Sequence, residues 1–476
     1  MSSEITPFTA FQTERKTHSI ILLLVSAIGV IVVFHLIGIG SYPLLGTTEG
    51  RYAEMAKKMV LTGQYLVPMF TDSEPFWGKP PLSMWITAAS MHLFGINEFA
   101  ARLPSWLASI GVGLLIVRLL APDTRAGLIA FLIWTGSYLG YAAFGKVHTD
   151  SILTLCVTLA LVGLYLGHTQ RAVFWLAVAY IGLGLGLLAK GPVVAVYIGM
   201  PWCFWLLLQR QFIPYVTSLS TWIGIGAACA IAVPWYIAAE AAYPGFLDYF
   251  LVGEHFQRFL DPGWSADLYG AGHHELLGTI LIFLAESLLP WSLLLPIFYL
   301  VRKKRRGSVE SAHISFLVIW AITPVLFFCA SANVVPNYVM PTMPAWVALL
   351  SIALIPFCYK RRQVIALALL AGLFPFIKLI QNANPASTYD EPRNQQALVR
   401  TFLESRTSEP LFFAGKRLYA AEFYFSDINY AMDEASLPRD TPYYLSMRSG
   451  REPFPNPSQC QEKPMTNNYR FFYCEP

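Results

Sequence analysis

Residues 19–40 read SIILLLVSAIGVIVVFHLIGIG, an almost wholly apolar run that is long enough to cross the roughly 30 Å hydrocarbon core of a bilayer as a helix. Further runs of about 17 to 22 residues have the same character. They lie near 103–121, 126–144, 150–167, 173–189, 192–208, 218–238, 278–300, 313–331, 338–357 and 363–381. Hydrophobic residues make up 55% of the chain and charged residues 13%, and the mean hydropathy is +0.49. The sequence therefore predicts an α-helical polytopic membrane protein with about 11–13 transmembrane helices.

The short connections between these runs alternate in charge. Lys and Arg residues gather on the side of the N-terminus, at Arg15, Lys16, Arg125, Arg171, Arg210, 302–306 and 360–362. Because positive residues mark the cytoplasmic side of membrane proteins, we expect a cytoplasmic N-terminus. The opposite, extracytoplasmic side then carries the long loops 41–102 and 239–277 and the tail from residue 382.

The chain changes character after residue 381. Residues 382–476 mix polar and aromatic side chains, which indicates a small C-terminal extracytoplasmic α/β domain after a membrane domain of residues 1–381. Cys460 and Cys474 lie in this tail and are expected to form a disulfide outside the cytoplasm. The net charge is only +4 and the basic residues form no continuous face, so we expect membrane lipids but no nucleic acid as partners.

Ionisable residues at the outer ends of membrane spans call for a functional explanation. The segment TTEGRYAE, residues 47–54, places Glu49 and Arg51 at the start of an amphipathic helix. Glu49 can act at a reacting centre, or it can simply complement the helix dipole. In the same loop, Lys79 lies between Gly78 and two prolines, where a compact ammonium suits a phosphate. The alternative is an interfacial lysine that extends toward the lipid headgroups.

Two more places on the same side carry ionisable groups. Asp150 enters an apolar run, which is costly unless the carboxylate is paired, although it can also cap the helix. Glu254 and His255, with His273 and His274 further along the loop, can bind a divalent ion, act as acid and base, or merely be solvated.

Together these segments resemble the GT-C glycosyltransferases that use polyprenyl-phosphate sugars. The resemblance is closest to the lipid A aminoarabinose transferase branch, with protein O-mannosyltransferases nearby, and it covers about residues 40–345. It rests on EGRYAE at 49–54, KPPL at 79–82, FG at 94–95, AARLP at 100–104, TD at 149–150, KGP at 190–192, EHF at 254–256, RF at 258–259 and PNY at 336–338.

This resemblance implies an enzyme of the bacterial inner membrane with a periplasmic C-terminal domain. It would move a sugar from an undecaprenyl-phosphate carrier to an extracytoplasmic acceptor such as lipid A, another envelope glycan or a protein, with inversion at the anomeric carbon. The implied roles are catalysis for Glu49 and Asp150, donor phosphate binding for Arg51, Lys79, Lys190 and Arg258, and substrate contact for Tyr52, Glu254, His255 and Tyr338.

Two positions depart from the family pattern. Thr48 stands where the family usually has an Asp before the Glu, and Gly78 stands where it usually has a Glu before the Lys. The acid role therefore falls on Glu49, and a metal site that pairs His255 with the missing Glu lacks one ligand. We expect no required cofactor, with a divalent metal at His255 as the remaining option.

A transporter or flippase of lipid-linked sugars is the rival class, since charged residues and broken helices also mark transport routes. Such a protein would carry polar residues through the depth of many spans, whereas here the ionisable groups gather at one surface. A sensor anchored in the membrane would need only one span. The sequence therefore favours the transferase and leaves the sugar and the acceptor open.

Overall fold

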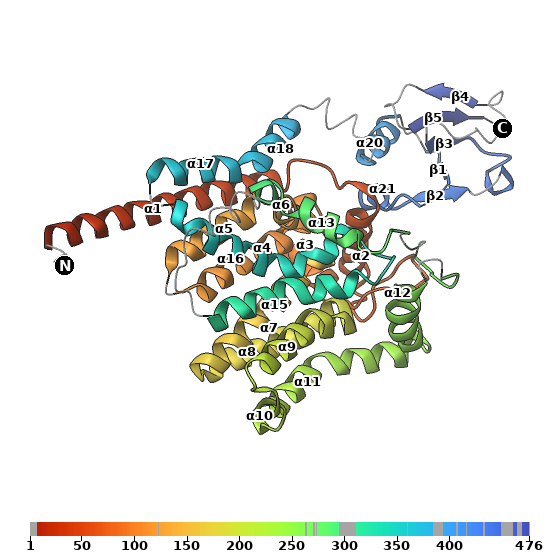
Figure 1. The fold of residues 1–476 in the computed structure, drawn as a ribbon. Helices are drawn as coiled ribbons and strands as arrows, with labels where there is room; N and C mark the ends of the chain where they lie inside the picture. Colours follow the sequence, from red (N-terminus) through yellow and green to blue (C-terminus); the bar gives the residue numbers. More distant parts are fainter. Residues whose placement is uncertain are drawn as a thin grey trace.

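The computed structural model describes residues 7–121, 123–261, 264–269, 272, 274–294, 311–358, 360–383, 394–405, 408–415, 417–431, 434–448, 460–463 and 469–475. A bundle of helices forms most of the molecule, and a small sheet lies at one end (Figure 1). The basic run 302–306, His273 and the end of the predicted run 278–300 lie outside the described residues. The predicted boundary at 381/382 is next to residues 384–393, which are also outside, and stays a prediction.

The α-helices follow one another along the membrane part of the chain. They are α1 (Pro7–Gly38), α2 (Gly46–Thr62), α3 (Leu82–Phe94), α4 (Glu98–Leu119), α5 (Thr124–Gly136), α6 (Tyr138–Gly145), α7 (Thr149–Gln170), α8 (Val173–Lys190), α9 (Met200–Leu208), α10 (Phe212–Val216), α11 (Leu219–Ala242), α12 (Arg258–Leu260), α13 (Thr279–Ser287), α15 (Ser311–Phe328), α16 (Met343–Leu354), α17 (Arg361–Ala371) and α18 (Leu373–Ala383). Tighter or wider turns link several of them: η1 (Gly191–Val193), η2 (Ala195–Gly199), η3 (Asp248–Gln257) and η5 (Pro336–Thr342).

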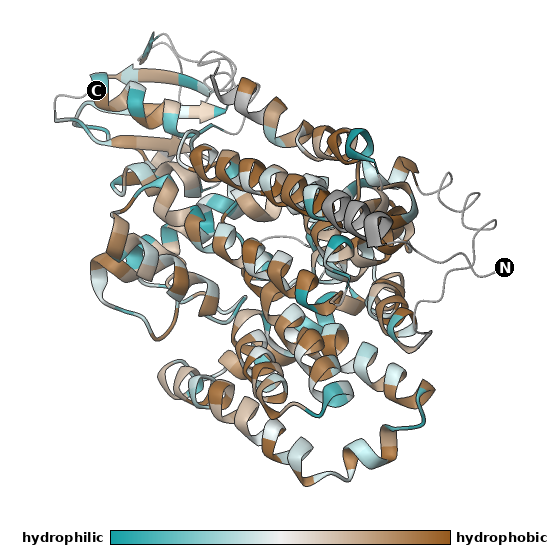
Figure 2. Cartoon of the chain, turned by 90° about the vertical axis from the view of Figure 1, so that its left-hand side faces the viewer, coloured by the Kyte–Doolittle hydropathy of each residue, from teal (hydrophilic) through white to brown (hydrophobic). Residues whose placement is uncertain are grey.

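Within the described residues, six helical stretches are long and apolar enough to cross a bilayer. They are His18–Gly38, Glu98–Leu119, Thr149–Gln170, Val173–Val193, Leu219–Ala242 and Pro336–Phe357. Hydrophobic residues cover these helices (Figure 2), and many point outward, such as Val33, Leu219 and Ile237 with 51%, 73% and 63% of their surface exposed. Exposed apolar side chains at this density suit a lipid surface, so the protein is a multi-pass membrane protein.

Other predicted runs are helical but interrupted. The run 126–144 becomes α5 and α6, which meet at an angle of 74° because Ser137 is extended and its side chain caps the next helix at the amide of Gly140. Run 192–208 contains η1 and η2 before α9, and run 363–381 divides at Gly372 between α17 and α18. Apolar composition predicted where these segments lie, but it could not show where each helix breaks.

The C-terminal part is a five-stranded mixed sheet with α20 (Gln396–Ser405) and α21 (Tyr419–Tyr424). Its strand order is β2 (Ile428–Ala431), β1 (Leu411–Ala414), β3 (Tyr443–Arg448), β5 (Tyr469–Cys474), β4 (Cys460–Lys463). The first three strands are parallel to one another, and β5 runs antiparallel to both β3 and β4. The predicted small α/β domain and the predicted disulfide between Cys460 and Cys474 are both confirmed.

Helix α2 attaches this domain to the membrane part (Figure 1). A Cβ at Gly50 would lie 2.5 Å from the backbone nitrogen of Ala420, so α2 and α21 approach more closely than any larger residue allows. The buried ammonium of Lys57 donates to the carbonyls of Glu422 and Phe423 at 2.7 and 3.0 Å. The loop 41–102 and the tail therefore lie on the same side of the bundle, as the charge pattern predicts.

Candidate functional site

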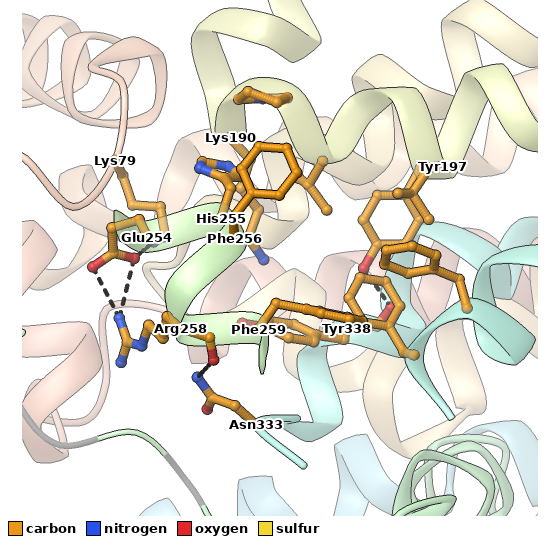
Figure 3. Close-up of a pocket in the computed structure, with 15 residues that line it drawn as sticks. Lys79, Lys190, Tyr197, Glu254, His255, Phe256, Arg258, Phe259, Asn333 and Tyr338 are labelled. Atoms are coloured by element: carbon orange, nitrogen blue, oxygen red, sulfur yellow. Dashed lines mark hydrogen bonds and ion pairs between the residues drawn. The ribbon is translucent and has the colours of Figure 1, made fainter. Parts of the chain in front are cut away.

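A cavity of about 220 Å³ lies among the ends of α8, η3, η5 and the loop before α3. We call it the charged cavity, and its lining combines ionisable groups with apolar and aromatic ones (Figure 3). The lining residues are Lys79, Lys190, Pro192, Val193, Val196, Tyr197, Glu254, His255, Phe256, Arg258, Phe259, Phe327, Phe328, Asn333 and Tyr338. Six of the predicted site residues are in this set: Lys79, Lys190, Glu254, His255, Arg258 and Tyr338.

Glu254 holds two cations at the mouth of the charged cavity. Lys79 Nζ lies 3.2 Å from Glu254 Oε2, and Arg258 Nη1 lies 3.0 and 3.1 Å from the two carboxylate oxygens. Burial opposes the charge on Glu254, but Lys79 and Arg258 outweigh it and hold the pKa of this carboxyl below its usual value. The carboxylate keeps both cations in place at neutral pH, while about a fifth of the Lys79 side chain stays exposed to the cavity.

Lys190 and Asp150 form a second, more deeply buried ion pair. The ammonium donates to Asp150 Oδ1, and Asn337 Nδ2 lies 3.5 Å from the other oxygen. The same ammonium lies 4.7 Å from the ring centroid of Tyr338, a cation–π contact. The ion pair with Lys190 offsets the free-energy cost of burying a charged carboxylate in an apolar helix, so Asp150 does more than cap α7.

The backbone after Lys190 requires a glycine. Gly191 has φ +76°, a conformation that L side chains rarely adopt, and a Cβ there would lie 2.5 Å from the ring of Phe250. This residue ends α8 and lets η3 pack against it, which places Lys190 and Glu254 on one cavity.

His255 is held in a fixed orientation on η3. Its Nδ1 lies 2.7 Å from the carbonyl of Phe250, and burial lowers the pKa of the imidazole, so the ring is neutral near pH 7. In the part of the chain that the structure describes, no three His, Cys, Asp or Glu side chains gather at metal-binding distance. A divalent ion at His255 stays a prediction, and elemental analysis of the purified protein tests it.

Glu49 lies in a different environment. Arg102, with none of its surface exposed, lies 2.8 Å from Glu49 Oε1 through Nε and 3.1 Å from Oε2 through Nη2. The amides of Leu45 and Val147 also donate to this carboxylate at 2.9 and 3.1 Å. Burial raises the pKa of Glu49, but Arg102 and the two amides lower it more. A carboxylate with these four contacts is a poor proton acceptor, so the geometry favours a structural role over the catalytic role predicted for Glu49.

Arg51 and Tyr52 follow on α2 and face different surroundings. The structure places Arg51 on a second, larger cavity beside the C-terminal domain, apart from the other residues predicted to bind the donor phosphate. Tyr52 is half-buried, and burial raises the pKa of its hydroxyl.

Two polar side chains on the charged cavity were not among the predicted site residues. Tyr197 lies in an apolar run, where a tyrosine is unremarkable, and its hydroxyl donates to the carbonyl of Tyr338 at 2.8 Å. Asn333 lies in a short turn and donates to the carbonyl of Arg258 at 3.2 Å. Both hold segments that carry predicted residues, and neither stands out in the sequence.

The chain is similar to several known proteins. Residues 19–250 match the family described as dolichyl-phosphate-mannose-protein mannosyltransferase. The chain is 30% identical over 325 residues to the undecaprenyl phosphate-alpha-4-amino-4-deoxy-L-arabinose arabinosyl transferase of Edwardsiella ictaluri, and this match covers 65% of the chain and 55% of the relative. It is 27% identical over 431 residues to transferase 2 of the same description from Pseudomonas fluorescens strain Pf0-1, with 87% and 75% covered.

The crystal structure of ArnT from Cupriavidus metallidurans bound to undecaprenyl phosphate has a similar fold. It superposes with a TM-score of 0.74 at 18% identity, over 94% of this chain and 97% of that one. The chain matches just over half the length of the Edwardsiella relative, and three quarters of the Pseudomonas one. The resemblance and the fold class predicted from the sequence motifs are confirmed.

Proposed function

We propose that this protein transfers a sugar from an undecaprenyl-phosphate carrier to an acceptor outside the cytoplasm. The observation that carries the proposal is the pair of cations, Lys79 and Arg258, held by Glu254 on a cavity that also has apolar and aromatic walls. A polyprenyl phosphate has the same division between a compact anion and a hydrocarbon chain. The two relatives are named as transferases that use undecaprenyl phosphate-linked 4-amino-4-deoxy-L-arabinose, which supports this donor and 4-amino-4-deoxy-L-arabinose as the sugar.

The chemistry follows from what leaves and what attacks. The carrier phosphate departs as an anion when the bond from its oxygen to the anomeric carbon breaks, so the site must supply positive charge where this charge develops. Lys79 and Arg258 are placed to do so. The acceptor oxygen forms its new bond from the opposite face, which inverts the anomeric carbon.

Asp150 is the carboxylate that we assign to the acceptor. If the attacking group is a hydroxyl, Asp150 accepts its proton, and the contact with Lys190 orients the carboxylate for this step. If the attacking group is a phosphate on lipid A, it is already ionised, and the Asp150–Lys190 pair orients it. Of the two carboxylates predicted as catalytic, our proposal gives the base role to Asp150, because Arg102 and two amides already occupy the Glu49 carboxylate.

The orientation is part of the proposal. The cavity, the loop 41–102 and the C-terminal domain would face the periplasm of a bacterial inner membrane, with the N-terminus in the cytoplasm. This places the transfer on the side where lipid A, envelope glycans and exported proteins are reached.

Reconstitution tests the function. Purified protein in nanodiscs, supplied with undecaprenyl-phosphate-linked aminoarabinose and lipid A, should release undecaprenyl phosphate and add one sugar mass to the acceptor. Asp150→Asn should bind the donor and lose turnover. Mass spectrometry of lipid A, O-antigen and envelope proteins from cells with and without the gene identifies the acceptor. Movement of the lipid-linked sugar across proteoliposomes without any transfer would favour the flippase class instead.

A further inference from the structure

A second cavity, of about 1530 Å³, lies between α2 and the C-terminal domain. Arg51 and Lys58 from α2 line one wall, Phe70 and Tyr269 another, and Arg417 and Tyr419 of the C-terminal domain a third. We call it the domain cavity. It shares no lining residue with the charged cavity.

The positive charges of the domain cavity are unequally compensated. Lys58 Nζ lies 2.8 Å from Asp72, and the Arg417 guanidinium forms two bonds of 2.5 and 2.7 Å with Glu422. Arg51 makes no ion pair with any carboxylate in the described residues, and its buried Nε has no hydrogen-bond acceptor. Buried polar groups nearly always form hydrogen bonds, so the Arg51 guanidinium is a candidate site for a ligand that accepts a hydrogen bond.

Arg51 and Arg417 face the same two rings. The Arg51 Cζ lies 4.9 Å from the centroid of Tyr419 and 6.0 Å from that of Phe70, and the Arg417 Cζ lies 5.6 Å from both. These cation–π contacts hold the two guanidiniums against the same two rings, and of the two only Arg417 forms an ion pair with a carboxylate in the described residues. Four carboxylates, Glu54, Asp72, Glu74 and Glu422, also line the cavity, but none of them forms an ion pair with Arg51. A compact anion such as a phosphate or a carboxylate would accept from the fork of Arg51.

The size of the cavity indicates more than a free anion. A phosphate ion would fill only a small part of about 1530 Å³, and the walls alternate aromatic rings with hydroxyl and charged groups. Sugars present both apolar faces and hydroxyl groups, which suits such a lining.

The domain cavity also adjoins the donor side of the molecule. The hydroxyl of Tyr269, which lines this cavity, accepts from the amide of Trp77 and donates to the carbonyl of Pro75, both at 2.8 Å. Tyr269 therefore supports the loop that carries Lys79.

From these contacts we propose that the domain cavity is the acceptor site, and that Arg51 and Arg417 bind an anionic group, phosphate or carboxylate, on an acceptor sugar. This rests on the proposed transferase function. The C-terminal domain is thereby part of the acceptor site, because it supplies Arg417 and Tyr419.

Ligand-observed NMR on the purified full chain tests this with four probes: glucose 1-phosphate, glucuronate, glucose and inorganic phosphate. We expect glucose 1-phosphate or glucuronate to bind at least tenfold more tightly than glucose and inorganic phosphate, and the better of the two identifies the anion. Saturating undecaprenyl phosphate should leave this binding unchanged, because the carrier occupies the charged cavity. Equal affinity for all four probes, no binding of either charged sugar, or displacement by undecaprenyl phosphate would each overturn the proposal.

Three variants localise the binding. Arg51→Gln should weaken the charged-sugar probe at least tenfold, and Arg51→Lys should recover part of that loss. Arg470→Gln is the control in the C-terminal domain and should change the affinity less than twofold, because Arg470 lines neither cavity and pairs with Glu462. Equal binding by wild type and Arg51→Gln would contradict the assignment. Donor binding and sugar transfer are measured apart from the probes, so a protein that binds charged sugars through Arg51 but transfers nothing would refute only the proposed function.

Discussion

The ammonium of Lys79 lies 3.2 Å from the same carboxylate, that of Glu254, which Arg258 contacts at 3.0 and 3.1 Å. Three side chains from two distant loops therefore form one charged unit, in which a single carboxylate fixes the spacing of two cations. A carrier phosphate would contact both cations at once, because Glu254 already orients them. This relationship makes the first prediction sharper than the sequence alone allowed.

Lys79→Ala should weaken donor binding and the chemical step together, on the order of 10²-fold or more, because an electrostatic stabiliser is removed. Lys79→Arg should recover little, since the compact Lys79 ammonium contacts Glu254 and the carbonyl of Gly78, and a forked guanidinium has a different shape and donor geometry. Undecaprenyl phosphate binding and single-turnover transfer measure both effects, with Lys463→Ala as the control because Lys463 lines neither cavity. Unchanged donor affinity and turnover in Lys79→Ala would disprove the phosphate-binding role.

Glu49→Gln should lower stability rather than chemistry alone. Its carboxylate is the ionic partner of the fully buried Arg102, and breaking a buried pair costs about 3–5 kcal/mol. Thermal unfolding of the purified variant in detergent should show a clear drop in Tm, and the double variant with Arg102→Met should recover part of it. A normal Tm together with lost turnover would instead return Glu49 to the catalytic step.

Stability should fall as the pH rises from about 5 to 8, in part through Glu54. Burial raises the pKa of this carboxyl to about 7, although Lys57 and Lys58 oppose the shift. The folded protein therefore holds a proton that the unfolded chain has lost, and the stabilisation is complete below the usual pKa and disappears as the pH rises through 7. The loss of stability is on the order of 3 kcal/mol, because each unit of pKa shift is worth roughly 1.4 kcal/mol. The Tm of Glu54→Gln should vary less over this range, and equal slopes for both proteins would refute the assignment.

Tags placed in two connections test the orientation. A reporter in the turn at Arg210 should be cytoplasmic, and one at Pro438 in the C-terminal domain should be periplasmic, because the basic residues of the connections lie on the former side. Protease accessibility in spheroplasts and in inverted vesicles measures this. Two reporters on the same side would invalidate the predicted arrangement of spans.

The disulfide between β4 and β5 predicts the redox state of the purified protein. Alkylation without reductant should leave Cys460 and Cys474 unlabelled, and alkylation after reduction should label both, as peptide masses will report. Labelling of both residues before reduction would mean that they are free thiols and would argue against an oxidising compartment.

Much of the charged cavity could be predicted because its residues carry chemistry that an apolar membrane chain does not otherwise need. Lys79, Lys190 and Glu254 stood out on that ground. Glu49 did too, but its sequence neighbourhood could not reveal that Arg102 would lie 2.8 Å away. Arg51 could not be assigned either, since consecutive helix residues point about 100° apart and only the position of α2 decides which cavity each one faces.

The breaks in the helices were equally hidden. Residues 126–144 are apolar throughout, and nothing in their composition shows that Ser137 ends one helix and caps the next. In the C-terminal domain the short strands were only weakly indicated, because five strands of four to six residues leave little room for an alternating pattern.

The close approach of Gly50 to Ala420 has a consequence for how such proteins can be recombined. Helix α2 fits its own C-terminal domain through a contact that admits no side chain and through a lysine whose hydrogen-bond acceptors are main-chain carbonyls of that domain. Deleting the domain would leave the Lys57 ammonium without those acceptors and expose the apolar face of α2 to water. A C-terminal domain grafted from a relative would therefore have to be transplanted together with the matching α2, so that the two segments are inherited as one piece although more than three hundred residues separate them.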